Sequence, residues 1–115
     1  MATTAIATSE LILAPEQEVD TPCLVVDETI LRRNIERMKV FADRVGVGLR
    51  PHIKTHKTPE IARMQLDAGA IGITCAKVGE AEVMVKQAGV TDVLLAYPTV
   101  GEPKIRRIFG SPTVG

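Results

Sequence analysis

The sequence predicts an α/β protein with a parallel sheet, because short apolar runs of strand type alternate with helical patterns along most of its length. Glycines at positions 46, 69 and 89 each follow a helical pattern, at intervals close to the size of a minimal strand–helix unit. Since crossovers between parallel strands are right-handed, two architectures remain open: a doubly wound open sheet, or a segment of a (βα)8 barrel.

The first expected unit is the strand CLVV, residues 23–26, followed by a helix that begins after Asp27 and ends at Gly46. The helix is expected because its apolar residues recur near a spacing of 3.6, with arginines on the opposite face. These apolar residues are Ile30, Leu31, Ile35, Met38, Phe41 and Ala42.

The next expected helix, over residues 58–69, has Thr58 as its N-cap, Pro59 in its first turn and Gly69 as its stop. The other elements follow the same cycle. They are the strands VGLRPHIK (47–54), AIGITCA (70–76) and DVLLAYP (92–98), and the helices at 79–89 and 100–110.

Composition excludes some classes of partner. Fourteen basic residues balance fourteen acidic ones, which gives no overall field toward nucleic acid or an anionic membrane. Three aromatic residues are too few for the stacking platforms of single-strand binders. The 1–19 segment is expected to be a flexible leader, and its LILA run is too short for a signal peptide or a membrane span, which predicts a cytoplasmic protein.

Cys23 and Cys75 lie far apart and show neither a CxxC spacing nor a disulfide-rich pattern. We interpret both as buried thiols, since free cysteine behaves as a small apolar residue.

The stretch LRPHIKTHKT, residues 49–58, gathers both histidines with several cations at the end of an expected strand. Strand alternation predicts that Val47, Leu49, Pro51 and Ile53 face the helices while Gly48, Arg50, His52 and Lys54 face the interior or crevice. Lys54 would then lie at the carboxyl end, where α/β proteins carry their chemistry. A desolvated lysine among other cations has a lowered pKa, so Lys54 is a candidate Schiff-base lysine.

Alternative interpretations exist for each neighbour in this stretch. Lys57 precedes the helix cap and is expected to be exposed, Arg50 could pair with a carboxylate such as Asp27, and His52 could be a hydrogen-bonded interior histidine. A zinc site from His52 and His56 is disfavoured, because HxxxH suits a helix and a strand would separate these residues by about 13 Å. No metal ligand is assigned.

Three stretches carry a resemblance: TPCLVVDETILRRNIERM, VGLRPHIKTHKTPEIARMQLDAGAIGITCAKVGEAEVM and DVLLAYPTVGEPKIRRI. Together they resemble the N-terminal part of the D-threonine aldolase and D-serine dehydratase group, which belongs to the alanine-racemase-like, fold-type III enzymes that use pyridoxal 5′-phosphate. The resemblance covers residues 20 to 109, and RPHxKTHK is among the group's most specific strings.

This resemblance implies that Lys54 binds the cofactor covalently, and it selects the N-terminal portion of a (βα)8 barrel, the fold of the alanine racemase N-terminal domain. Because Arg50 and His52 share the expected interior face with Lys54, we predict that they also bind the cofactor. A complete barrel needs about 250 residues. We therefore expect residues 20–115 to be a partial barrel of about three βα units, truncated before the remaining strands and the C-terminal β domain.

The implied activity is that of a lyase acting on D-β-hydroxy amino acids, either by retro-aldol cleavage to glycine and an aldehyde or by elimination. A divalent metal, Mn or Zn, is implied in a homodimeric parent, with ligands outside this chain. The segment alone is expected to be inactive. Two alternatives stay open: a non-catalytic pyridoxal phosphate carrier, and an inactive βα fragment.

Overall fold

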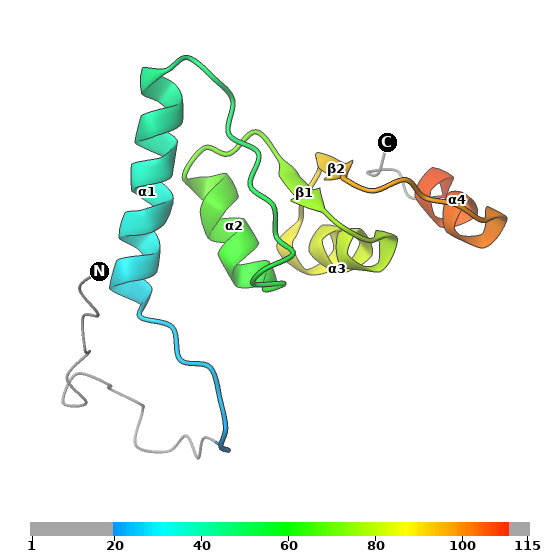
Figure 1. Ribbon diagram of the computed structural model, residues 1–115, viewed down its shortest axis with the longest axis horizontal. Coiled ribbons are helices and arrows are strands. Elements are labelled where there is room, and N and C mark those ends of the chain that lie inside the picture. Colours follow the sequence, from blue (N-terminus) through cyan, green and yellow to red (C-terminus); the bar gives the residue numbers. More distant parts are fainter. Residues whose placement is uncertain (1–19, 111–115) are drawn as a thin grey trace.

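The computed structural model describes residues 20–110, so the expected leader at 1–19 lies outside the described residues (Figure 1). Helices and strands alternate through much of this range, as the sequence predicts. In chain order they are α1 (Glu28–Arg44), α2 (Pro59–Asp67), β1 (Ile73–Cys75), α3 (Val78–Ala88), β2 (Val93–Leu95) and α4 (Glu102–Phe109).

The two strands form a small parallel sheet, with Ile73 opposite Val93. A third segment joins its free side, because His52 forms an isolated parallel bridge with Thr74. Each strand spans three residues and is shorter than the seven-residue run that predicted it. The parallel α/β class is confirmed, and the sheet is smaller than expected.

The core lies between this sheet and the helices α2 and α3, which cover it in Figure 1. Ile53, Ile73 and Val93 contribute from the sheet, while Ala62 and Met84 contribute from the helices. All five are buried. The sheet residues are β-branched, and packing them against helices is the main source of stability for so short a sheet.

The run CLVV does not form the predicted strand. Residues 23–26 have no strand partner in the described part of the chain, and Leu24 is fully exposed. The expectation that Cys23 is buried is therefore wrong, whereas Cys75, in β1, is buried as predicted. The helix that follows has Met38 and Phe41 more than half exposed, so part of its apolar face is uncovered.

Helix boundaries agree closely with the sequence. The Asp27 side chain accepts a hydrogen bond of 2.9 Å from the Ile30 amide and so caps α1. Gly46, Gly69 and Gly89 have φ values of 71°, 99° and 62°, which is the left-handed conformation expected where each helix stops. Within residues 20–110, no helix combines the length and apolarity needed to span a membrane.

Candidate functional site

The segment that carries the predicted site residues is held against β1 by backbone hydrogen bonds. The Ile53 amide donates to the Thr74 carbonyl at 2.9 Å, and the Thr74 amide donates to the Pro51 carbonyl at 2.8 Å. Both bonds are those of a parallel pair. Lys54 is thus the first residue beyond the paired segment, at its carboxyl end, as the sequence predicts.

Lys54 lies in a turn that Lys57 closes. The Lys57 amide donates to the Ile53 carbonyl at 2.8 Å, and Lys57 itself has a φ of 51°, in the left-handed region. The Lys54 amide donates to Nδ1 of His52 at 3.2 Å, and the Lys54 side chain is exposed. The turn therefore presents a primary amine to solvent at the end of the sheet.

The predicted interior face is wrong for His52. This side chain lines a cavity of about 390 Å³ with residues of α1 and α2, next to Leu49 and Pro51, which alternation had placed on the opposite side. Regular alternation fails here because the segment forms a single bridge instead of a full strand.

Both histidines accept a backbone hydrogen bond on Nδ1. His52 accepts from Lys54, and His56 accepts from the Thr58 amide at 3.0 Å, which places the ring proton of the neutral form on Nε2. Within residues 20–110, the buried Nε2 atoms of both rings and Oε1 of Gln65 have no hydrogen-bond partner. Burial lowers the pKa of His56 below its usual value, because the charged ring is poorly solvated there.

Arg50 forms an ion pair, but with a partner other than the suggested Asp27. Its Nη1 and Nη2 donate to Oδ1 and Oδ2 of Asp92 at 2.7 and 2.9 Å. Asp92 immediately precedes β2, so the pair spans the sheet from the 49–53 segment. The hydrogen bonds from Arg50 lower the pKa of Asp92.

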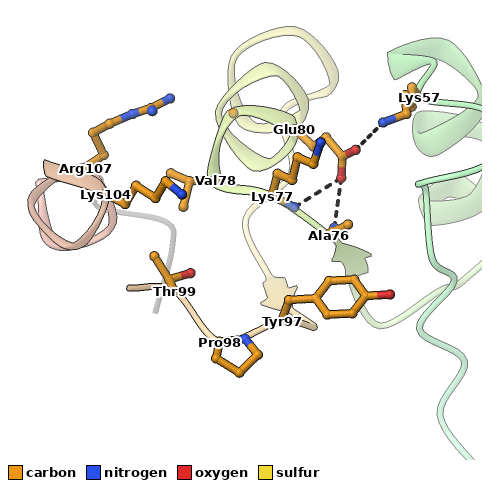
Figure 2. A pocket seen from close by; sticks show the side chains of 11 residues that line it. Lys57, Ala76, Lys77, Val78, Glu80, Tyr97, Pro98, Thr99, Lys104 and Arg107 are labelled. Carbon is orange, nitrogen blue, oxygen red and sulfur yellow. Dashed lines mark hydrogen bonds and ion pairs between the residues drawn. The ribbon is translucent and has the colours of Figure 1, made fainter. Parts of the chain in front are cut away.

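Glu80 is a site residue that the sequence reasoning missed. Its Oε2 accepts from the Ala76 and Lys77 amides at 2.8 and 3.3 Å, while its Oε1 accepts from Lys57 Nζ (Figure 2). Burial alone would raise the pKa of Glu80, but the hydrogen bonds from Lys57 and Ala76 outweigh burial and lower it. An acid in the first turn of the helix expected at 79–89 is the signal that could have identified it.

The loops after β1 and β2 and the first turn of α3 border a cavity of about 650 Å³ (Figure 2). Its lining includes Lys57, Lys77, Lys104 and Arg107 but not Lys54. The predicted residues Arg50 and His52 do not line it either, so none of the three predicted site residues borders this cavity. No group of three or more His, Cys, Asp or Glu side chains in the described range is placed to hold a metal ion.

No family profile matches the chain. Several individual proteins are similar to it in sequence. D-threonine aldolase from Arthrobacter sp. is 47% identical over 91 residues, which is 79% of this chain and 24% of that protein. 3-Hydroxy-D-aspartate aldolase from Paracoccus denitrificans is 37% identical over 101 residues, or 87% of this chain and 26% of that protein. D-serine dehydratase from Dictyostelium discoideum is 34% identical over 85 residues, or 70% and 21%.

Solved structures of proteins with similar names also match this chain over part of their length. The crystal structure of D-threonine aldolase from Filomicrobium marinum superposes with a TM-score of 0.74 at 47% identity, over 77% of this chain and 24% of that one. D-threo-3-hydroxyaspartate dehydratase, a C353A mutant in a metal-free form, gives 0.68 at 45% identity, over 71% and 21%. The chain thus spans about a quarter of the length of the curated relatives it matches.

Proposed function

Because this chain is a homologue of the enzymes named D-threonine aldolase, 3-hydroxy-D-aspartate aldolase and D-serine dehydratase, we propose that it supplies the cofactor-binding lysine of a pyridoxal phosphate-dependent lyase. The substrates proposed are D-β-hydroxy amino acids. The observation that carries the proposal is the position of Lys54, an exposed primary amine at the carboxyl end of a parallel strand segment.

The residues present fit this cofactor at one point in particular. An aldehyde needs a primary amine that is accessible, and Lys54 is exposed in the turn after the sheet. In this proposal Arg50 and His52 help to position Lys54. The ion pair of Arg50 with Asp92 fixes the strand segment, and Nδ1 of His52 accepts the hydrogen bond of the Lys54 amide. A direct cofactor contact would require either side chain to move.

When bound, pyridoxal phosphate withdraws electrons from the bonds at Cα of an amino acid. The role proposed for Lys54 is to hold the cofactor through Nζ and, once a substrate amine has displaced it, to take up or deliver a proton at Cα. Exposure of Lys54 implies that further structure covers it in the active enzyme, because water must be excluded from such a site.

That further structure is proposed to be the rest of a (βα)8 barrel. The three parallel segments found here, each followed by a helix, are the repeating unit of this fold. A divalent metal such as Mn²⁺ or Zn²⁺ would assist by polarising the β-hydroxyl of the substrate, with ligands outside residues 20–110. A homodimeric, cytoplasmic parent is part of the same proposal.

A chimera tests the function. Residues of this chain replace the 91-residue matching segment of the Arthrobacter enzyme, and cofactor absorbance and cleavage of D-threonine to glycine are measured. Lys54→Ala should abolish the visible band of the lysine-bound cofactor and lower the rate by at least about a hundredfold. The matched control, Lys57→Ala, should keep the band.

Retention of the band and the rate in the Lys54→Ala chimera would overturn the assignment. A band at Lys54 without turnover of D-threonine or D-serine would instead support a cofactor carrier. The products then separate the two lyase reactions, because cleavage gives glycine and an aldehyde while elimination gives a keto acid and ammonia.

A further inference from the structure

Two lysines three residues apart each carry a primary amine close to the proposed site. Lys54 and Lys57 both have exposed side chains on one turn, at the edge of the sheet that carries the proposed site. They differ in their partners. Lys57 Nζ is paired with Glu80, whereas no carboxylate in the described residues lies within 4 Å of Lys54 Nζ.

The carboxylate of Glu80 is held in place by contacts other than its ion pair with Lys57. Its side chain is 11% exposed, and its Oε2 is fixed by the backbone amides of Ala76 and Lys77 (Figure 2). Pairing with Lys57 therefore costs little further side-chain entropy of Glu80, and the remaining cost is that of ordering Lys57. Lys57 remains 57% exposed, so its amine would otherwise be accessible.

Attachment of an aldehyde requires the neutral amine. The nitrogen lone pair attacks the carbonyl carbon, a carbon–nitrogen double bond forms, and the carbonyl oxygen leaves as water. An ammonium group that donates to a carboxylate has no free lone pair, so Lys57 Nζ must leave Glu80 Oε1 before it can react with an aldehyde.

We propose that Glu80 is a positioning residue that withholds Lys57 from the cofactor aldehyde and so leaves Lys54 as the reactive amine of the turn. The inference rests on the proposed function, since it presumes that Lys54 takes up the aldehyde. It goes beyond that function by assigning the choice between the two lysines to a residue on α3.

The test labels the 115-residue chain with pyridoxal phosphate. Borohydride then adds hydride to the carbon of each double bond, which fixes the label, and peptide mass spectrometry measures the labelled fraction at Lys54, Lys57 and Lys104. Lys104 is an exposed reference amine on α4. In the unaltered chain, Lys54 should carry more label than Lys57.

Glu80→Gln keeps an oxygen for the backbone amides but removes the charge. It should raise the label at Lys57 relative to Lys104 by about two- to fivefold, the range expected for loss of an exposed ion pair. The matched control is Glu82→Gln on the same helix, which removes a carboxylate paired with Arg107 and should leave the Lys57 ratio unchanged.

An unchanged Lys57 ratio in folded Glu80→Gln would overturn the inference while leaving the proposed function intact. Absence of label at Lys54 in the unaltered chain would overturn the proposed function. If circular dichroism shows that Glu80→Gln does not fold, a salt series on the unaltered chain decides. Screening at 1 M salt should raise the Lys57 to Lys104 ratio, and a flat ratio contradicts the inference.

Discussion

The guanidinium of Arg50 donates two parallel hydrogen bonds, of 2.7 and 2.9 Å, to the carboxylate of Asp92, which lies 42 residues later in the chain. This pair joins the outer strand segment to the start of β2, although β1 lies between them. A planar, two-point contact of this kind fixes orientation as well as distance. It therefore sets how the segment that carries Lys54 lies on the sheet.

Removal of either partner should destabilise the fold modestly, and the effects should not add. Arg50→Ala and Asp92→Ala each lose the same contact, so the double variant should shift the urea midpoint by less than the sum of the two single shifts. Urea unfolding of the four chains, followed by circular dichroism, measures this. Strictly additive shifts would show that the pair does not contribute as a unit.

Gly72 lies beneath this ion pair and should not tolerate a side chain. A Cβ at this position would come within 2.7 Å of the Asp92 carbonyl oxygen and would also collide with Arg50 Nη1. Because a backbone oxygen cannot move freely, Gly72→Ala should lower the free energy of unfolding by about 1–3 kcal/mol.

Gly79→Ala is the matched control for this substitution. Its Cβ would meet nothing closer than Arg107 Nη2 at 3.8 Å, and the residue lies in α3. The change should be neutral or stabilising by up to about 1 kcal/mol. If both variants lose the same free energy of unfolding, the close approach at Gly72 is not the cause.

Local signals predicted the helices well. Asp27, Thr58 and Pro59 mark helix starts, and the glycines at 46, 69 and 89 adopt the left-handed conformation at helix ends. These features depend on neighbours within one turn, so the sequence contains all the information that they need.

The pairing of strands, the partners of ion pairs and the directions of side chains depend on residues that are distant in sequence, and these features were predicted less well. CLVV has strand composition, but nothing in the described chain pairs with it. Asp27 is nearer to Arg50 in sequence than Asp92 is. Arg50 nevertheless pairs with Asp92, because the sheet brings Asp92 alongside it. His52 faces the helices for a different reason: a segment with one bridge does not maintain the strand alternation that the prediction assumed.

Stability should depend on pH through His56. Burial lowers the pKa of this ring in the folded state, so the unfolded chain binds a proton more readily. Stability should be fully present above the unfolded value of about 6.5 and should fall as the pH decreases below it. Urea midpoints at pH 7.5 and 5.5 measure this difference above the main titration range of the carboxylates.

His56→Asn should reduce the difference between the two midpoints, since an amide can still accept the Thr58 hydrogen bond but does not titrate. His52→Asn is the control, because it removes the other imidazole and leaves His56 in place. A pH difference that persists unchanged in His56→Asn would contradict the role assigned to burial of this ring.

The two cysteines should differ sharply in reactivity. Cys75 is fully buried in β1, and burial, together with the charge of Glu80, raises the pKa of its thiol to about 11. At pH 8 only about one thiol in a thousand would be ionised at that pKa, and the thiolate is the reactive form. Cys23 lies in the exposed segment before α1. Iodoacetamide at pH 8 should therefore modify Cys23 and leave Cys75 unmodified until denaturant is added, as peptide mass spectrometry would show.

A Cys23→Ser chain should take up no label while folded. Rapid modification of Cys75 in that folded chain would mean that β1 is not buried under α3, which would contradict the packing of the sheet at its centre.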